Sequence, residues 1–443
     1  MNEIQQDIEL DEARRFVDSK LGVIKAVVEA RRRIGESHYF HYSCRLTNLE
    51  RVLSSNNNPL FSTNASLNKK QCELSAIAEA LERYCAVMKN YEDEQLYLSY
   101  NNKDGKNFIH PNTLPACSDS EYENPYNILS KPKENHKYYW TMCYDLINKK
   151  EIYVPSSFIY LQTTINSKSE LITTPNSTGT AGGQTIEDAT NNAILEGLER
   201  EAIMVTWLNQ LPRHKIDLES INNTEILKRI DALEKLGNKV NLFDIRTDFS
   251  IPIIFCILQS KKYPYITTSA AAKLSPIPAI VRALDEAYST RKFAAYNEEI
   301  FKERIYYKDY KNVIDFEDHL YLYNMTDMQK KLDFLVQSKE KISIDSLPQN
   351  KNILNSSSKQ ILEYFIKEFS KRNINLIVKD ITTSDICNSS FKFVKMFSPE
   401  LVWLTPNHNY RFLKNKRIKS CLPKMGFNSF LNNEITNLPH PFA

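Results

Sequence analysis

The sequence predicts a mixed protein of the α/β or α+β class, in which helices pack against a large sheet. Two observations lead to this class. Long segments rich in helix-forming residues and short apolar runs of strand length occur along the same chain, and they alternate irregularly, without a periodic repeat. The length of 443 residues suits two or three domains or one large one.

Four segments predict helices: 69–90, about 185–209, 279–297 and 358–371. The first is rich in Ala, Leu and Glu and contains neither Gly nor Pro. The second follows Thr185, and Asp188 stands three residues later, which is the spacing of a capping box. The third follows the segment SPIP (275–278), whose prolines suit a helix start. The fourth lies in a Lys-, Asn-, Asp- and Tyr-rich region, 300–370, which we expect to be variable and partly exposed.

Strand-like runs separate these helices. Residues 1–60 are mixed and end in the polar stretch SSNNNP, and residues 91–135 are irregular. The predicted strands are 137–144, 151–160, 239–246, 251–259, 265–270, 374–381, 391–397 and 400–404.

Glycine is scarce. Only nine residues are glycine, whereas an average usage of about 7% predicts about 30. The sequence contains neither G-x-x-x-x-G-K-[ST] nor G-x-G-x-x-G, which excludes the two commonest backbone loops for nucleotides. Gly179, Gly182 and Gly183 nevertheless lie within five residues, directly before the second helix. We therefore expect a tightly folded backbone there.

Charge and cysteine content exclude several classes of protein. The net charge of +3 is too balanced to indicate nucleic-acid or membrane binding. The eight cysteines are scattered, without a C-x-x-C pair or a metal-like spacing to histidine, so a zinc site is not supported. The N-terminus is polar and acidic rather than a signal peptide, and the longest apolar runs are too short to span a membrane. We expect a reduced, cytoplasmic protein.

Two of the predicted helices carry the same motif. Segments 75–84 (SAIAEALERY) and 192–201 (NAILEGLERE) are identical at six of ten positions, and each contains E-x-x-E-R. Spacings of three and four residues place these groups on one helix face. Ser75 and Asn192 lie one turn earlier on the same stripe, and Asp188 lies a further turn back. The repeated groups are Glu79, Glu82, Arg83, Glu196, Glu199 and Arg200.

The motif has an ordinary explanation and a functional one. In each copy the first glutamate and the arginine form an i,i+4 pair worth about 0.2–0.5 kcal/mol, and a polar stripe is commonly a solvent face. Glutamates three residues apart repel each other, however, and the pattern occurs twice. A divalent cation would explain it, since Mg²⁺ takes carboxylate oxygens together with substrate phosphates and arginine binds phosphate oxygens.

The third helix carries a weaker copy in segment 282–291 (RALDEAYSTR). Glu286 aligns with Glu79 and Glu196, and Arg291 follows one turn later. Alone this is typical of an ordinary surface helix, but after two stronger copies it becomes a candidate third wall. The scattered histidines fit no Ser-His-Asp or Cys-His arrangement, and we interpret them as structural.

At these residues the chain resembles the YcaO family. Residues 75–83 match its S-x-x-x-E-x-x-E-R motif, and NSTGTAGGQTIEDATNNAILEGLERE (176–201) resembles its S-N-G-x-A-x-G-[NT]-x-x-E-A…E-x-x-E-R block. Segment 282–291 is similar to its A-L-x-E…Q-x-R segment. The end NLPHPFA (437–443) is similar to the proline-rich terminus of the azoline-forming cyclodehydratase branch, the D-proteins.

The resemblance implies an ATP-binding fold without a P-loop, spanning residues 61–443, preceded by a segment (1–60) that contacts a partner or peptide. It implies ATP-dependent conversion of Cys, Ser or Thr residues of a ribosomally made precursor peptide to thiazoline or oxazoline. Mg²⁺ would be held by the four motif glutamates. Catalysis is assigned to Glu199 and the C-terminal carboxylate of Ala443. Nucleotide contacts are assigned to Ser75, Arg83, Gln184, Asp188, Asn192, Arg200, Glu286 and Arg291.

The chain departs from the family pattern at three places. The G-K-G-like turn before the first motif helix reads NASLNKK (64–70), where Lys69 or Lys70 is a candidate substitute. Ser289 stands where Gln is common. The chain ends PHPFA, so the last proline is replaced by alanine. His440 is a candidate acid–base group, although packing is its more ordinary role.

The family also implies partners. We expect a separate leader-binding protein of the E1-like or ThiF-like type, because no such domain is fused here, and a flavin-dependent azoline dehydrogenase where azoles are made. A homodimer is one option. Three alternatives stay open: thioamide or amidine formation on the same fold, a non-catalytic scaffold for another enzyme, and an unrelated α/β protein. The sequence names neither the peptide nor a preference for Cys over Ser and Thr.

Overall fold

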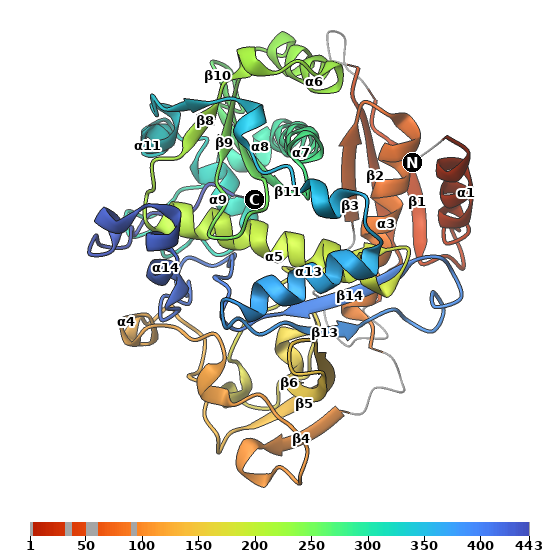
Figure 1. Cartoon of the computed structure of the whole chain (residues 1–443), viewed down its shortest axis with the longest axis vertical. Coiled ribbons are helices and arrows are strands. Elements are labelled where there is room, and N and C mark those ends of the chain that lie inside the picture. Colours follow the sequence, from red (N-terminus) through yellow and green to blue (C-terminus); the bar gives the residue numbers. More distant parts are fainter. Residues whose placement is uncertain (1–2, 32–37, 50–60, 90–94, 443) are drawn as a thin grey trace.

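Three β-sheets organise the chain (Figure 1). The computed structural model describes residues 3–31, 38–49, 61–89 and 95–442. Within them, the first sheet is antiparallel, with the order β1-β2-β3, and consists of β1 (Ile24–Glu29), β2 (Phe40–Leu46) and β3 (Phe61–Ser66). Helix α3 (Lys69–Val87) begins just after β3 and packs on this sheet, and α1 (Glu3–Arg14) packs on α3.

The second sheet has the order β11-β10-β9-β8-β12. It consists of β8 (His214–Ile216), β9 (Asn238–Asp244), β10 (Ile253–Ser260), β11 (Ile266–Ala272) and β12 (Lys341–Ile342). Both faces of β10 are buried: Ile253, Phe255 and Ile257 pack in one core cluster, and Ile254, Cys256 and Leu258 pack in another. Its unbroken apolar run reflects this burial, because alternate residues of a strand face opposite sides.

The third sheet has the order β4-β5-β13-β14-β7, with β6 paired to β5. Its strands are β4 (Gln95–Ser99), β5 (Lys137–Asp145), β6 (Lys150–Pro155), β7 (Thr180–Gly183), β13 (Ile377–Asp380) and β14 (Lys392–Phe397). Strands far apart in sequence meet here, since β7 and β13 both pair with β14. In Figure 1 this sheet forms the lower part of the molecule.

The central helix α5 (Ile186–Leu208) lies between the second and third sheets (Figure 1), in contact with β11 and β14. Most of its residues are buried. Helices α6 (Thr224–Lys235) and α7 (Pro276–Tyr296) cover the opposite face of the second sheet, and α13 (Ser358–Ser370) packs against α5. Further short helices are α4 (Asp119–Glu123), α8 (Glu298–Phe301), α9 (Phe316–Leu322), α10 (Thr326–Gln329), α11 (Asp333–Val336), α12 (Lys351–Leu354) and α14 (Arg417–Ser420).

The four predicted helices are confirmed as α3, α5, α7 and α13. Helix α7 starts three residues earlier than predicted, because Pro276 occupies its first turn and needs no backbone partner there. Only half of the predicted capping box forms at α5. Thr185 Oγ1 accepts the Asp188 N–H at 3.1 Å, but the Asp188 carboxylate accepts from the Ser358 hydroxyl of α13 instead.

Two strand predictions were wrong in part or whole. Segment 151–160 is a strand only to Pro155, where a 3₁₀ turn begins. Segment 400–404 is buried but is not a strand. Side chains take its backbone hydrogen bonds: Val402 N donates to Glu201 Oε1 at 3.3 Å, and Leu401 O accepts from Asn415 Nδ2 at 2.8 Å. The other predicted strands are confirmed as β5, β9, β10, β11, β13 and β14.

The N-terminal segment is built onto the rest of the fold. Strand β2 pairs with β3 along its length. On α1, Gln6 donates to Gln71 at 3.0 Å and Arg14 pairs with Glu73 at 2.8 Å, both on α3. The described part of residues 1–60 thus supports the first motif helix directly, and its contact with a partner or peptide stays a prediction.

The glycine cluster lets the backbone turn and also lets neighbouring backbone segments approach it closely. Gly179 has a φ of +79°, a left-handed conformation that glycine adopts without strain, and a Cβ there would lie 2.5 Å from Met396 O. Gly182 and Gly183 instead lie in β7. A Cβ on Gly183 would lie 2.4 Å from the backbone nitrogen of Ala189 in α5. The prediction of a tight backbone before the second helix is confirmed.

All eight cysteines are free. Among the described helices, none combines the length and the hydropathy needed to cross a bilayer.

Candidate active site

The two E-x-x-E-R motifs lie on α3 and α5; Arg83 pairs with Glu79, whereas Arg200 lies near both glutamates of its own motif. Arg83 Nη2 lies 2.7 Å from Glu79 Oε1, and Arg83 also donates to Phe61 O at 2.7 Å. Arg200 lies 3.5 Å from Glu196 and 3.7 Å from Glu199. The backbone fixes both α5 carboxylates: Glu196 accepts the N–H of Gly179 at 3.1 Å, and Glu199 accepts that of Ala272, on β11, at 3.0 Å.

Helix α7 brings a third set of charged groups near the two motifs. Glu286 pairs with Arg282 at 2.7 Å. The positive charge of Arg282 lowers the pKa of Glu79 on α3. The negative charge of Glu286 raises the pKa of Glu199 on α5. Three helices that are far apart along the chain therefore bring their carboxylates into one electrostatic field. Arg282 was not assigned from the sequence, although it opens the segment quoted for the third motif.

The grouped carboxylates resist ionisation in the absence of a ligand. Burial raises the pKa of Glu82 well above its usual range, and the neighbouring charges of Glu196 and Glu79 raise it further. Burial also raises the pKa of Glu199, against the opposing effect of Arg200. Like charges brought together in a partly buried place favour the protonated forms. A bound cation would reverse this preference.

The residues present fit a cation and an anionic ligand. Among the described residues, the Glu82 carboxylate has no hydrogen bond or ion pair, although it is half-buried. The Nε of Arg200 is buried and donates no hydrogen bond. No three acidic, thiol or imidazole groups in this part of the chain are gathered closely enough to hold a metal as they stand. Glu79, Glu196 and Glu286 are turned instead toward arginines.

The site also includes a buried lysine, which the sequence analysis did not identify. Lys395, on β14, is fully buried, and its Nζ donates to Asn176 O and Thr178 O at 2.7 Å each. Burial lowers its pKa, and the charges of Glu196 and Glu82 oppose that shift. It holds the loop whose next residue, Gly179, binds Glu196. Nothing in the strand sequence KFVKMF distinguishes Lys395 from a solvent-facing lysine.

The other predicted nucleotide-binding residues have partners outside the carboxylate group. Ser75 accepts from Gln71 at 3.0 Å. Asn192 donates to Gly182 O at 2.9 Å, and Gln184 donates to Glu9 of α1. Asp188 bonds Ser358, as described above, and Arg291 donates to Asn238 at 2.8 Å. Their contacts to nucleotide stay predictions.

The C-terminal segment reaches the motif arginine. The Phe442 ring is buried, and its centroid lies 4.6 Å from the guanidinium carbon of Arg200. Ala443, predicted to supply a catalytic carboxylate, lies outside the described residues. His440 packs in the interior, stacked on His319 with ring centroids 3.7 Å apart, and burial lowers its pKa well below its usual range. It is a packed, neutral histidine, as expected.

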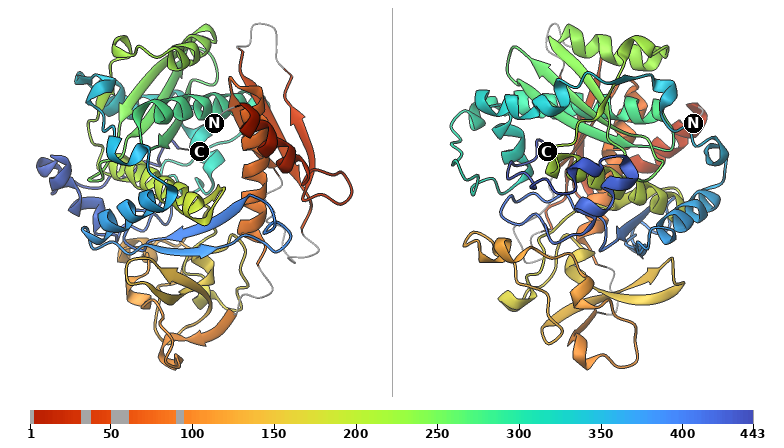
Figure 2. Two further views of the ribbon diagram at one scale, coloured as in Figure 1. Left: turned by 45° about the vertical axis from the view of Figure 1, so that its right-hand side comes forward. Right: turned by 60° about the vertical axis from the view of Figure 1, so that its left-hand side comes forward.

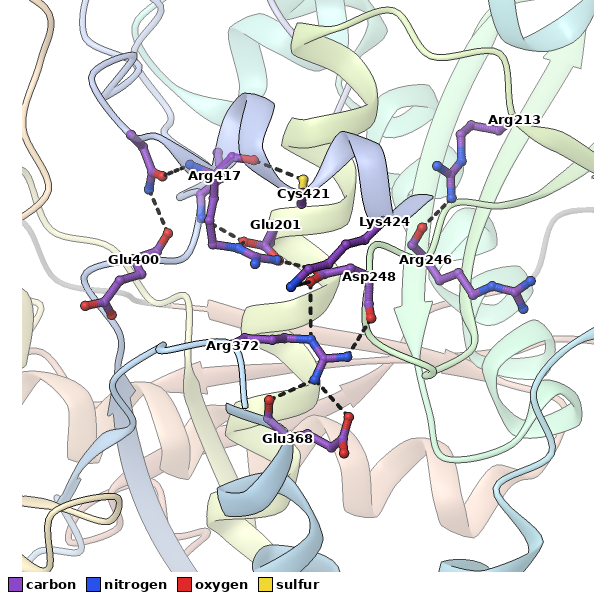
Figure 3. A network of polar contacts seen from close by, with 12 residues as sticks. Glu201, Arg213, Arg246, Asp248, Glu368, Arg372, Glu400, Arg417, Cys421 and Lys424 are labelled. Carbon is purple, nitrogen blue, oxygen red and sulfur yellow. Dashed lines mark hydrogen bonds and ion pairs between the residues drawn. The ribbon is translucent and has the colours of Figure 1, made fainter. Parts of the chain in front are cut away.

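A buried charge network fastens α5 from its far side (Figure 3). Glu201 follows Glu199 by two residues and so points away from the site. It is fully buried and pairs with Arg417 through two contacts of 2.7 Å. Arg417 also bonds Asp248 at 2.7 Å, and Asp248 pairs at 3.2 Å with Arg372, which lies just after α13.

The profile of a family described as "YcaO cyclodehydratase, ATP- and Mg²⁺-binding" matches residues 65–402, well over half of the chain. The chain belongs to the YcaO family. The match begins just before α3 and ends after β14, so it includes all three helices of the site.

Solved YcaO-type structures share the fold. A heterocyclase in complex with substrate and cofactor superposes with a TM-score of 0.78 at 17% identity, covering 99% of this chain and 57% of that one. YcaO from Methanopyrus kandleri, bound with AMPPCP and Mg²⁺, gives 0.64 at 15% identity, with coverage of 89% and 91%. The E. coli microcin synthetase McbBCD complex with pro-MccB17 bound gives 0.58 at 14%, with coverage of 84% and 87%.

The match spans only part of some relatives. An uncharacterised protein of Methanothermobacter thermautotrophicus is 24% identical over 230 residues, which are 50% of this chain and 55% of that protein. The chain therefore spans about half the length of this curated relative and of the first heterocyclase.

Proposed function

We propose that this protein is an ATP- and Mg²⁺-dependent peptide cyclodehydratase, which converts Cys, Ser or Thr residues of a ribosomally made peptide to thiazoline or oxazoline. One observation carries the proposal. The charges of the two E-x-x-E-R helices act on one another, with the Glu82 carboxylate half-buried, repelled by Glu196 and Glu79, and unpaired among the described residues. Family membership and the heterocyclase fold support the same conclusion.

The four motif glutamates, Glu79, Glu82, Glu196 and Glu199, are the proposed Mg²⁺ ligands. When bound, Mg²⁺ supplies positive charge to the phosphate oxygens. Arg200 suits the same phosphates, because its buried Nε has a free donor and guanidinium groups bind phosphate through several N–H groups. The Gly179 N–H binds Glu196, and Lys395 holds the loop that precedes Gly179 through the carbonyls of Asn176 and Thr178.

The proposed reaction needs no nucleophile from the protein. The substrate thiol or hydroxyl adds to the preceding carbonyl carbon, and the carbonyl oxygen takes the γ-phosphoryl group of ATP. The addition closes the five-membered ring; departure of that oxygen as phosphate, with loss of the amide proton, then forms the C=N bond of the azoline, so that one ATP yields ADP and phosphate for each ring. The protein's part is positioning and charge neutralisation, as in other phosphoryl transfers. Glu199 and the terminal carboxylate of Ala443 are the proposed groups for moving protons.

We also propose a separate leader-binding protein of the E1-like type. The McbBCD complex, which shares the fold, has several components and was solved with pro-MccB17 bound, and the first heterocyclase extends beyond the part matched here. A flavin-dependent dehydrogenase would act on the azolines afterwards. Assays of the isolated chain test the partner: full, leader-dependent turnover without any other protein would contradict it.

Replacing Glu199 with Gln tests the function directly. We expect E199Q to lose ATP turnover by at least about 100-fold, because the substitution removes a metal-binding charge at a site of phosphoryl transfer. Phosphate release and loss of water from the peptide, followed by mass spectrometry, are the measurements. Exchange of oxygen for sulfur in the product would indicate the thioamide alternative.

The matched control is Glu187→Gln. Glu187 lies in the first turn of the same helix, α5, and is not part of the motif. It should keep both activities. Persistence of ATP hydrolysis and peptide dehydration in E199Q would show that the site is wrongly assigned.

A further inference from the structure

The C-terminal segment, residues 436–442, is held by its backbone carbonyls. Four successive carbonyl oxygens each face a buried side chain, and these side chains come from three elements of the fold. The Leu438 oxygen accepts from Trp207 Nε1 at 2.9 Å, and the Pro439 oxygen accepts from the Tyr323 hydroxyl at 2.6 Å. The next two contacts are His440 O with His319 Nδ1 at 2.7 Å and Pro441 O with Thr268 Oγ1 at 2.6 Å.

The chemistry of the segment matches its surroundings. Proline lacks a backbone N–H, so the sequence Pro-His-Pro presents mainly acceptors. The surrounding side chains supply donors. Trp207 lies on α5, Thr268 on β11 and His319 on α9, with Tyr323 at the end of α9. All four side chains are buried. The carbonyls that accept from Trp207, Thr268 and Tyr323 would each lose their only described partner if the donor were removed, at a cost that water cannot readily offset. The neutral His319 has one N–H for two carbonyls, because its Nε2 also lies 3.0 Å from Pro406 O.

These contacts end at the candidate active site. Phe442 follows Pro441 directly and lies against the Arg200 guanidinium, 4.6 Å from ring centroid to guanidinium carbon. An aromatic ring attracts a guanidinium that lies over its face. The ring thus restricts Arg200 on one side, while Glu196 and Glu199 lie 3.5 and 3.7 Å from its nitrogens.

We propose that Trp207, Thr268, His319 and Tyr323 form a carbonyl clamp, and that the clamp positions Arg200 for nucleotide phosphate by fixing Phe442 against it. The second step rests on the proposed function, whereas the clamp itself does not. Because the clamp contacts backbone oxygens, it depends on the length of the segment and the number of prolines more than on side-chain identity.

Two pairs of neighbouring residues provide matched variants. Tyr323→Phe and Thr268→Val remove clamp hydroxyls. Tyr321→Phe and Thr267→Val remove hydroxyls from equally buried neighbours on the same elements, and those hydroxyls have no hydrogen-bond partner in the structure. Each clamp variant and its control therefore differ chiefly in the lost contact to the C-terminal segment.

Digestion of the full chain with carboxypeptidase Y, followed by intact mass, measures release of the segment without any assay of function. We expect the clamp variants to lose C-terminal residues about tenfold faster than their controls, as the loss of one buried hydrogen bond implies. Equal rates in variant and control would overturn the clamp.

Calorimetric titration with AMPPCP and Mg²⁺ measures the second step. We expect a weaker Kd for both clamp variants and for Phe442→Leu, which removes the ring but keeps the clamp, by about fivefold. Unchanged affinity in variants whose segment is released would overturn the positioning of Arg200. Failure of the unmodified protein to bind AMPPCP would count against the proposed function, while the digestion would still decide the clamp.

Discussion

At the residue scale, some groups of the site can be identified from the sequence, whereas others are found only in the folded structure. The motif glutamates and arginines are recognisable because their spacing repeats, and like charges three residues apart need an explanation. Lys395 has no such signal. Its partners are carbonyl oxygens of residues 176 and 178, more than 200 positions away, so its role depends on the pairing of β14 with β7.

Replacing Lys395 with Met tests its structural role. We expect K395M to lower the free energy of unfolding by about 3 kcal/mol, because the carbonyls of Asn176 and Thr178 lose a donor that is itself fully buried. Lys392→Met is the control. Lys392 also donates to two carbonyls, at 2.8 Å each, but it is only half-buried, so water can replace it. Urea denaturation measures both, and equal losses would contradict a special role for Lys395.

At the element scale, composition predicts the helices well because each presents a long run of helix formers. The strands are harder to predict, since burial decides them. Segment 400–404 has the apolar character of a strand, yet Glu201 and Asn415 bond its backbone and no neighbouring strand does. Strands β1 and β2 were not predicted, because their sequence is mixed and their pairing depends on β3.

The network behind α5 (Figure 3) makes a prediction about the helix as a unit. Arg417→Met should lower the free energy of unfolding by about 3–5 kcal/mol, because it leaves Glu201 as a buried charge without a counter-ion. Asp248 would lose one of its two arginine partners and keep Arg372. Lys235→Met, which breaks the exposed pair with Asp231, should change it by less than about 1 kcal/mol. Chemical denaturation distinguishes them, and a small effect of R417M would show that solvent reaches the network.

At the scale of the whole molecule, the site depends on the meeting of three distant segments. The repeated motif indicates which helices meet. The strand order of the sheets that bring these helices together could not be predicted from the sequence. The left view of Figure 2 shows α7 above α5, with α3 at one side. The C-terminal segment closes this arrangement, and its proline-rich pattern indicated a role near the site without indicating Trp207, Thr268, His319 or Tyr323, whose donors lie on three separate elements.

Buried histidines near that segment predict how the whole fold responds to acid. Burial lowers the pKa of His319 to about 4 and that of His408 to about 2. In the unfolded chain histidine titrates near pH 6.5. Between about pH 6.5 and 4 the unfolded state therefore binds more protons at these residues than the folded state, and their contribution to stability falls as the pH falls.

The carboxylates of the site act in the opposite direction. The pKa values of Glu82 and Glu199 are raised by burial, so the folded state keeps protons that the unfolded state releases, and acidification stabilises it through them. The total slope of stability against pH is therefore a balance of these two effects, and the contribution of one histidine is found by comparing a variant with the unmodified protein.

We expect His319→Gln to be less stable than the unmodified protein at pH 7.5, because it loses its contacts to the C-terminal segment. We also expect it to lose less further stability between pH 7.5 and 5. His214→Gln, at an exposed position, should lose less stability at pH 7.5 than His319→Gln, because its side chain is solvated. Urea midpoints at the two pH values measure both variants, and parallel slopes for His319→Gln and the unmodified protein would show that His319 is not held neutral by the fold.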